Sequence, residues 1–500
     1  MSFNNGLIDP FGLPDCEKER TKYGEQYEDI FFDEAPFNKP ALEQFSYLIV
    51  GRKGAGKTAL SAFLSFQKTI PNCRYVELDV FQIYKNIFHR ASSWIDQRRQ
   101  LVIPELAVAW DLLVWSYIID AMGDEVQHVD RNAESRSFSP SSIFERLAQI
   151  IVSNDREKVS ADLEKIKADA SLEDAKAEVC RRCVRRPMIV AIDTLEQYDI
   201  NDSLLMFAQA ALIEFAANFN ASYSDRGLHL KVFVPGEVFP YLYQRIVLNP
   251  AKSINHPVFL LWRARDLLRL ICWRLFKRLE AAHYEFSRPQ LHIDWENYRD
   301  VLGNMWTPFF GKQVENSKGF MEESFPYVLR HTQMRPRQLI YLCNTIANRS
   351  LRGNRFPQAM VQDVKEGVRE GEDTLAKDIL NSYSSVYENV DKIIPALKGA
   401  PMSFPGSELD RLAKRTRSQW PSGQYSLDEF RRLVAEIGVV GRVPLGNGSS
   451  QKISAEFEYS LSRHLNLAPE DQCVIHPMFY SHLSIDTRSS SIVMPFEGEQ

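Results

Sequence analysis

The sequence has few cysteines, and their placement does not suggest a disulfide framework. Seven cysteines are spread over 500 residues, and the first residues, MSFNNGLIDPFG, lack the basic start and apolar run of a secretory signal. This usage predicts reduced thiols and a cytoplasmic location. Cys180 and Cys183 form a C-x-x-C pair, but structural zinc needs four ligands and no second pair has matching spacing. We therefore expect inert thiols there.

The sequence also lacks a long uninterrupted apolar run and a strong excess of one charge. The longest apolar candidate, LAVAWDLLVWSYIIDAM (106–122), is short for crossing a bilayer and contains Asp111 and Asp120. It predicts a buried helix and no membrane partner. The net charge of −5 gives no general attraction to nucleic acid. No grouping of Ser, His and Asp, or of Cys and His, suggests a nucleophilic enzyme.

What the sequence does contain is a series of short, apolar, β-prone runs separated by helical patterns. This alternation predicts an α/β fold with a parallel sheet. The five runs are FSYLIV (45–50), CRYVELDV (73–80), PMIVAID (187–193), LHLKVFV (228–234) and PVFLLW (257–262).

The pattern along the chain predicts several regions. Prolines and glycines around 395–408 mark a boundary. Beyond it, two helices and the strands VVGRV, SAEFEYS and QCVIHP follow the order of a winged helix. The expected regions are an N-terminal lead-in (1–44), a core (45–262) with a helical insertion at about 81–186, a helical lid (263–395), a winged-helix-like domain (396–485) and a disordered tail (486–500).

The first apolar run leads into a phosphate-binding motif of the form G-x-x-x-x-G-K-T. An apolar strand precedes the glycines and an apolar helix face follows them, which is the context that the motif requires. Backbone N–H groups of such a turn surround phosphates, and the helix dipole adds positive potential. We expect Lys57 to reach the β- and γ-phosphates and Thr58 to bind Mg²⁺. The nucleotide-binding candidates in the turn are Gly51, Arg52, Lys53, Gly54, Ala55, Gly56, Lys57 and Thr58.

An acidic residue at the end of another predicted strand complements this motif. The run MIVAID places Asp193 at the carboxyl end of a strand, where ligands of parallel sheets bind, and predicts a second Mg²⁺ ligand. Glu196 is the candidate for polarising the attacking water. The alternatives are a strand-capping role for Asp193 and a surface role for Glu196.

These two motifs resemble those of the AAA+ and STAND-type P-loop ATPases. LIVGRKGAGKTAL is similar in particular to a bacterial group found in phage-defence and mobile gene clusters. The resemblance covers roughly 40–350 and implies ATP and Mg²⁺ as cofactors. HPVFLLWRARDLLRLICWRLFKRL resembles the segment that opens the lid in STAND-like members. TQMRPRQLIYLCNTIA resembles the helix that carries the sensor-2 arginine, which implies that role for Arg337, with Arg335 as second candidate.

Three positions differ from the common pattern of that family. Thr194 follows Asp193 where many members carry a glutamate, and Met334 replaces a glycine before the sensor-2 arginine. The fourth apolar run leads into FVPGE, so that Glu237 is the candidate at the sensor-1 position. Within the basic helix 263–278, either one arginine acts on a neighbouring subunit or the helix is simply solvated.

The sequence therefore supports two main hypotheses of different classes. The first is a Mg²⁺-dependent ATPase whose nucleotide state drives assembly or partner regulation; bacterial antiphage defence is implied only by the resemblance. The second is a nucleotide-gated module with little turnover that contacts DNA or an effector protein. A homo-oligomer or an effector is the expected partner. DNA contact stays open because residues 401–485 carry nine basic and nine acidic residues, with a local cluster at Arg411–Arg417. A DNA-loading motor is a third hypothesis.

Overall fold

The computed structural model folds as two compact units. The sheet unit comprises Phe37–Lys53 and Lys57–Leu260, and the helical unit comprises the preceding residues, Gly54–Gly56 and Leu261 onward. The structure describes residues 8–79, 99–123, 140–150, 153, 155–193, 200, 202–247, 250–283, 293–316, 319–444, 452–460, 464–487 and 491–496.

The sheet unit is built on five parallel strands in the order β2-β3-β4-β1-β5. The predicted α/β fold with a parallel sheet is confirmed, and each of the five predicted runs supplies one strand. The strands are β1 (Leu48–Gly51), β2 (Arg74–Asp79), β3 (Met188–Asp193), β4 (Leu228–Pro235) and β5 (Val258–Phe259). β1, β3 and β4 are almost wholly buried, as their Val- and Ile-rich sequences require of strands covered on both faces.

Two long apolar helices form the core of the sheet unit beside the strands. α6 (Arg99–Met122) packs against α11 (Ser203–Tyr223), which also packs on β4. The indole Nε1 of Trp110 donates to the Ala208 carbonyl at 2.8 Å, and the rings of Trp115 and Phe219 lie 5.7 Å apart. The prediction of a buried helix at 106–122 is confirmed.

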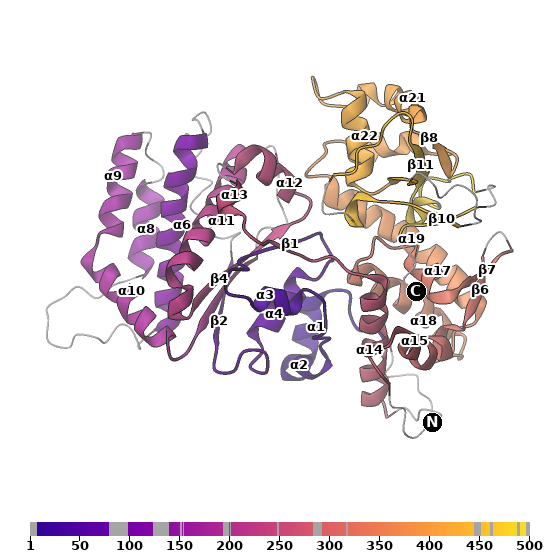
Figure 1. Cartoon of the computed structure of the whole chain (residues 1–500), viewed down its shortest axis with the longest axis horizontal. Coiled ribbons are helices and arrows are strands. Elements are labelled where there is room, and N and C mark those ends of the chain that lie inside the picture. Colours follow the sequence, from indigo (N-terminus) through magenta and orange to yellow (C-terminus); the bar gives the residue numbers. More distant parts are fainter. Residues whose placement is uncertain are drawn as a thin grey trace. The chain divides into compact units, whose positions relative to one another are not determined.

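Most of the described residues between β2 and β3 are helical. α8 (Pro140–Ile150), α9 (Arg156–Lys167) and α10 (Ala170–Cys183) lie beside α6 (Figure 1). Side chains of Asp155 and Asp169 cap α9 and α10 at their first turns. The remaining elements of the sheet unit are α3 (Asn38–Leu42), α4 (Lys57–Ser65), a 3-10 turn (Ser224–Arg226), α12 (Phe239–Tyr241), a π-turn (Leu242–Ile246) and α13 (Pro250–Ser253).

The helical unit is organised around three long helices with buried apolar faces. These are α14 (Ala264–Ala281), α18 (Pro336–Arg352) and α19 (Val361–Tyr383), and α18 packs against both others. The shorter elements between and after them are α15 (Tyr298–Val301), a π-turn (Leu302–Trp306), α16 (Thr307–Phe310), β6 (Gln313–Glu315), β7 (Met321–Glu323), α17 (Ser324–Leu329), α20 (Val390–Ile393) and a 3-10 turn (Ile394–Leu397).

The N-terminal segment is an integral part of the helical unit. It contains α1 (Cys16–Tyr23), a 3-10 turn (Gly24–Gln26) and α2 (Tyr27–Ile30). The amide of Asn344 on α18 accepts from the Phe11 N–H at 3.1 Å and donates to the Gly12 carbonyl at 2.7 Å. Arg274 on α14 pairs with Glu19 at 2.5 Å. Because these groups are buried, the segment completes the packing of both helices.

The C-terminal part combines two helices with a three-stranded antiparallel sheet. α21 (Ser407–Arg415) packs against α22 (Leu427–Glu436), and the strand order is β8-β11-β9. The strands are β8 (Ser403–Pro405), β9 (Val440–Arg442) and β11 (Gln472–Ile475), and 3-10 turns span Arg417–Gln419, Glu458–Ser460 and Pro477–Phe479.

Two details of the C-terminal prediction are wrong. SAEFEYS (454–460) forms no strand of its own: Ser454 ends β10 (Lys452–Ser454), Glu456 makes an isolated bridge with Arg442, and Glu458–Ser460 is a 3-10 turn. The tail predicted to be disordered contains β12 (Ile492–Met494), which pairs in parallel with β10. Ile492 and Val493 are buried there, so a short apolar run is ordered by packing that its length alone does not predict.

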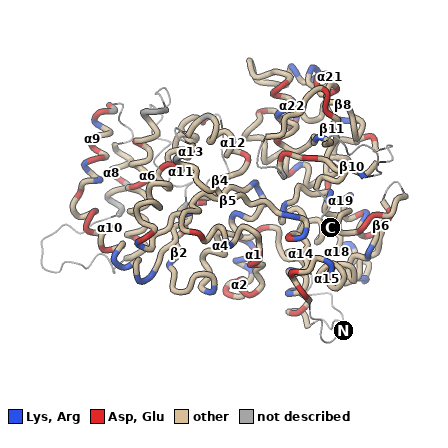
Figure 2. The backbone as a smooth tube through the Cα atoms, viewed as in Figure 1, with Lys and Arg blue, Asp and Glu red and all other residues tan. Residues whose placement is uncertain are grey.

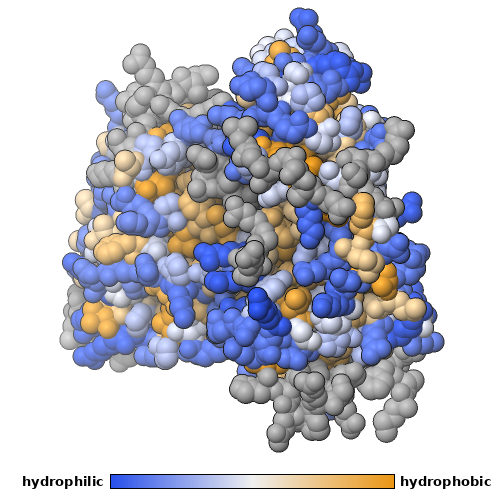
Figure 3. All heavy atoms as spheres, turned by 45° about the vertical axis from the view of Figure 1, so that its right-hand side comes forward, coloured by the Kyte–Doolittle hydropathy of each residue, from blue (hydrophilic) through white to orange (hydrophobic). Residues whose placement is uncertain are grey.

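The surface and the cysteines complete this description. On the face seen in Figure 3, most surface residues are hydrophilic, and smaller groups of hydrophobic residues lie among them. Two stretches, Val102–Met122 and Ser203–Arg226, are long and apolar enough to span a membrane, but 72% and 78% of their best windows are buried in the protein. Core helices of soluble proteins have the same character, so this is weak evidence of a membrane span. All seven cysteines are free thiols, as predicted.

Candidate phosphate-binding site

The glycine-rich turn connects the end of β1 to the start of α4. β1 ends at Gly51 and α4 begins at Lys57, as the motif predicts. Gly54 has φ +80° and Gly56 has φ +107°, a backbone region that residues with a Cβ rarely adopt. Both glycines are therefore needed for the chain to wrap as tightly as it does between strand and helix.

The end of β4 holds this turn from the sheet side. The Gly236 N–H donates to the Gly51 carbonyl at 3.0 Å, and the Lys53 N–H donates to the Glu237 carboxylate at 2.9 Å. Glu237 is only 4% exposed. Glu237 is the residue that the sequence suggested for the sensor-1 position. In the structure its carboxylate contacts the backbone of the turn. The contact of Gly236 with the turn was not predicted from the sequence. Its position directly after the β4 run could have indicated it.

Lys57 is a buried cation with no acidic partner in the part of the chain that the structure describes. Its residue is 7% exposed, and its ammonium donates to the Gly51 carbonyl at 3.0 Å. No carboxylate among the described residues forms an ion pair with it. Since buried charges are normally paired, one carbonyl dipole compensates this ammonium only in part. An anion bound at the turn would supply the missing charge, and the N-terminus of α4 adds to that potential.

The middle of the turn, Gly54–Gly56, is part of the helical unit. The indole Nε1 of Trp262 donates to the Ala55 carbonyl at 2.8 Å. The Arg337 N–H approaches the Gly54 carbonyl at 3.4 Å, and a Cβ at Gly54 would lie 3.1 Å from the Arg337 Cβ. Arg337, the residue that the family resemblance suggests for sensor 2, therefore touches the turn.

Arg335 is engaged in a different set of contacts. It is 3% exposed, it precedes α18 directly, and its guanidinium donates to the Gln333 side chain at 2.8 Å. Gln333 in turn donates to the Ile437 carbonyl at 2.7 Å. These contacts favour Arg337 over Arg335 for a role at a phosphate.

Asp193 lies at the carboxyl edge of the sheet, as does the turn. It ends β3, and its Cα pairs in register with Phe233 of β4, which lies between β3 and β1. Two strand spacings correspond to about 9.5 Å. In that register Asp193 is level with Ile49, two residues before β1 ends. The Thr58 hydroxyl on α4 and the Asp193 carboxylate are the side-chain groups of this region that could hold a Mg²⁺. Glu196 and Thr194 lie outside the described residues.

The basic helix α14 is not a simple solvated helix. Arg269 is 9% exposed at its side chain and pairs with Glu34 and Glu296 at 2.8 and 2.7 Å. Together with Arg274 it binds acidic groups of the helical unit. Arg263 and Arg265, at the start of α14, are exposed. An arginine that acts on a neighbouring subunit must be accessible, and of the basic residues of this helix Arg263 and Arg265 meet that requirement best.

The arginines before β3 lie at the amino end of that strand. Figure 2 shows basic residues gathered at the end of α10. Arg181 and Arg182 both bind the Glu178 carboxylate. Cys180 and Cys183 are buried beside them, and burial raises the pKa of the Cys180 thiol. These observations agree with inert thiols and a surface role for the arginines.

The C-terminal histidines have partners that the sequence did not reveal. His464 Nδ1 lies 3.1 Å from a Glu458 carboxylate oxygen, and this contact raises the pKa of His464. His482 Nδ1 lies 2.9 Å from Asp373. His476 is fully buried and contacts the Tyr459 hydroxyl at 2.7 Å. Asp373 is 109 positions away from His482, so no local pattern in the sequence indicates this pair.

A scan of protein-family models finds no match for the chain, and a search of curated proteins finds none either.

Proposed function

We propose that this protein is a Mg²⁺-dependent ATP hydrolase whose nucleotide state controls assembly or the engagement of a partner. The observation that carries the proposal is the buried Lys57 ammonium, which faces a glycine-rich turn at a helix N-terminus and pairs with no described carboxylate. A triphosphate would provide the counter-charge. ATP is favoured over GTP by family resemblance, and no Asn-Lys-x-Asp tetrad for reading guanine occurs in the sequence.

We assign the following roles to the chain's own residues, and the role of Glu196 rests on the sequence alone. Backbone N–H groups from Gly54 to Thr58 would surround the phosphates, and Lys57 would neutralise their charge. Thr58 and Asp193 would hold the metal. Bound Mg²⁺ would supply charge stabilisation of the transferred phosphoryl group. Arg337 would sense the γ-phosphate, and Glu196 would orient the attacking water.

The C-terminal part supports a role in partner contact. Two helices with a three-stranded antiparallel sheet have the composition of a winged helix. Its basic cluster is exposed at Lys414, Arg415 and Arg417, whereas Arg411 pairs with Glu408. We propose contact with a second copy or an effector protein, with DNA as the alternative, in a cytoplasmic setting. A role in antiphage defence rests on the family resemblance alone.

Steady-state phosphate release tests the enzymatic proposal. Lys57→Ala is expected to reduce ATP turnover by at least about a hundredfold, because it removes charge stabilisation of the transition state. Lys68→Ala, which removes an exposed lysine just beyond α4, is the matched control and should leave turnover unchanged. Equal activity of parent and Lys57→Ala would refute the proposal.

The second candidate is a nucleotide-gated module with little turnover. Thr194 favours it, since no glutamate stands directly after Asp193. Calorimetric ATP binding by the parent without phosphate release would select this candidate. Glu196→Gln separates the two further, because it lowers turnover only if Glu196 orients water. Stimulation of turnover by duplex DNA would instead identify a DNA-dependent motor.

A further inference from the structure

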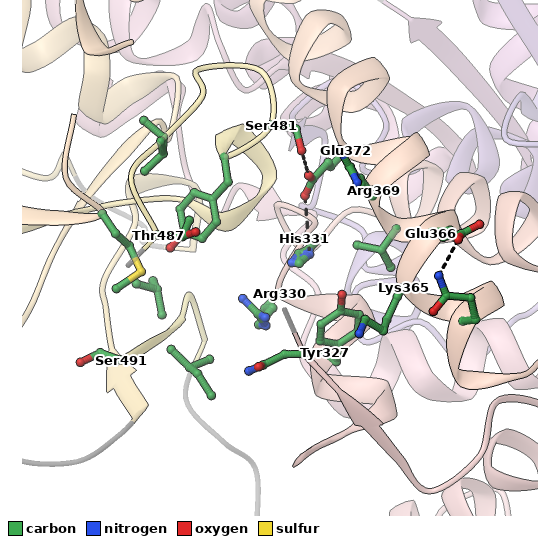
Figure 4. A pocket seen from close by; sticks show the side chains of 18 residues that line it. Tyr327, Arg330, His331, Lys365, Glu366, Arg369, Glu372, Ser481, Thr487 and Ser491 are labelled. Atoms are coloured by element: carbon green, nitrogen blue, oxygen red, sulfur yellow. Dashed lines mark hydrogen bonds and ion pairs between the residues drawn. The ribbon is translucent and has the colours of Figure 1, made fainter. Parts of the chain in front are cut away.

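A cavity of about 400 Å³ lies inside the helical unit, remote in sequence from the glycine-rich turn. Its walls come from the end of α17 and the residues after it, from one face of α19, and from the C-terminal segments around Tyr480 and β12 (Figure 4). This volume is in the range of pockets that bind small molecules, about 300–1,000 Å³.

Three polar groups on the wall have unused hydrogen-bonding capacity. Neither ring nitrogen of His331 has a hydrogen-bond partner among the described residues, and His331 is 6% exposed. Its Nδ1 lies 3.9 Å from Glu372, beyond hydrogen-bond distance, and burial holds the pKa of His331 well below its usual range. The Tyr480 hydroxyl and the Arg330 Nε are likewise buried without a described partner. Such groups are costly unless something binds them.

The charge on the wall is positive after pairing is taken into account. Arg330 pairs with Glu322 at 3.0 Å, and Glu366 pairs with Arg349. Burial raises the pKa of Glu372 to about 7, which lowers its negative charge near neutral pH. The two remaining cations are on α19.

Those cations, Lys365 and Arg369, are four residues apart and therefore lie on one face of the helix. Neither forms a hydrogen bond or an ion pair with another part of the chain that the structure describes. Lys365 is half-buried and Arg369 is exposed. They form the charged side of the cavity, whereas His331 and Tyr480 belong to its buried, uncharged side.

We propose that this cavity binds a small phosphate-bearing molecule. Its phosphate would lie against Lys365 and Arg369, and its uncharged hydrogen-bonding part would reach His331 and Tyr480. Two cations on adjacent helical turns, with the Arg330 Nε nearby, provide donors from several directions, which suits a tetrahedral dianion better than a planar carboxylate. The neutral imidazole offers one donor and one acceptor, as recognition of hydroxyl or ring-nitrogen groups requires.

The test is calorimetric titration of the full-length Lys57→Ala chain, so that neither binding at the turn nor hydrolysis contributes to the result. The probes are adenosine 5′-monophosphate, ribose 5-phosphate and inorganic phosphate, with uncharged adenosine as reference. At least one of the two organic phosphates should bind, and Lys365→Ala combined with Arg369→Ala should weaken it by at least about tenfold. Lys392→Ala combined with Lys398→Ala removes two exposed lysines of the same unit and should change the affinity less than about twofold.

Other results would overturn the proposal. They are no binding of any phosphate probe, adenosine binding as tightly as its monophosphate, or equal losses in the two double variants. Thermal melting of each variant verifies that it is folded. The titration uses a chain without a functional turn, so a negative result would argue against the cavity proposal and would not affect the ATPase proposal. In the same way, a negative ATPase assay would not affect the cavity proposal.

Discussion

The backbone N–H of Lys53 donates a 2.9 Å hydrogen bond to the carboxylate of Glu237. The turn proposed to hold phosphates is thus fixed by an acidic side chain from the end of the neighbouring strand β4. A carboxylate in this position would repel a bound triphosphate, although it also positions the backbone that is proposed to bind the phosphates. Glu237 therefore connects the geometry of the turn to its affinity.

Glu237→Gln separates these two effects. Glutamine keeps an oxygen that accepts from Lys53 and removes the negative charge. We expect ATP to bind about fivefold more tightly, which corresponds to about 1 kcal/mol of lost repulsion. Titration calorimetry of the parent and the variant measures it. Weaker binding in the variant would show instead that the carboxylate contributes to holding the metal.

Gly54→Ala should damage nucleotide binding through the backbone. The residue has φ +80°, and a Cβ would lie 3.1 Å from the Arg337 Cβ. We expect a loss of affinity of about tenfold from strain of about 1–2 kcal/mol. Gly303→Ala is the matched control, because its φ is ordinary and its Cβ would meet nothing within 4 Å. Similar affinities in both variants would contradict this view of the turn.

Arg337→Ala should affect turnover more than binding. The residue touches Gly54, and a charge that acts on the γ-phosphate stabilises mainly the transition state. We expect kcat to fall by about a hundredfold. Arg352→Ala, at the exposed end of the same helix, should leave kcat unchanged. If Arg335→Ala lowers kcat with unchanged folding stability and Arg337→Ala does not, the roles of the two arginines are reversed.

Glu372 should make stability depend on pH. Burial raises the pKa of this carboxyl to about 7, against an ordinary value of 4.5, although Ser481, Arg330 and Arg369 lower it and Asp373 adds to the rise. His331 stays neutral throughout, since its pKa is well below the usual range. Between these two pKa values the folded state binds more protons than the unfolded state. The contribution of the protonated Glu372 to folding stability is therefore complete below pH 4.5 and is lost as the pH rises through about 7.

Glu372→Gln removes this dependence because glutamine mimics the protonated acid. The free energy of unfolding of the variant minus that of the parent should rise by about 2.5 kcal/mol when the pH is raised from 5 to 8. Denaturant unfolding at both pH values measures the difference. Glu388→Gln replaces an exposed glutamate of the same unit and should show no such gain. An equal gain in both variants would rule out Glu372 as the source.

The sheet and the turn could be predicted because their signals are local. Runs such as MIVAID combine β-branched residues with continuous burial, and the turn needs glycines at fixed offsets from Lys57. β8 was missed because Ser403–Pro405 is short and ends in proline, which is rare inside sheets. β12 was missed because three residues are too few for a periodic pattern.

The α19 cavity left no local signal in the sequence. Its walls join segments far apart, as in the hydrogen bond between Ser481 and Glu372, which are 109 positions apart. The unpartnered nitrogens of His331 become visible only after the neighbouring helices have removed it from solvent. Lys365 and Arg369, read alone, are typical of any exposed helical face.

The buried amide of Asn344 has a practical consequence for engineering this protein. A shortened version that begins near the first strand would remove the hydrogen-bond partners of that amide and the ion-pair partner of Arg274. An affinity tag should therefore not be fused next to residues 8–13, and a fragment that lacks these residues is expected to aggregate.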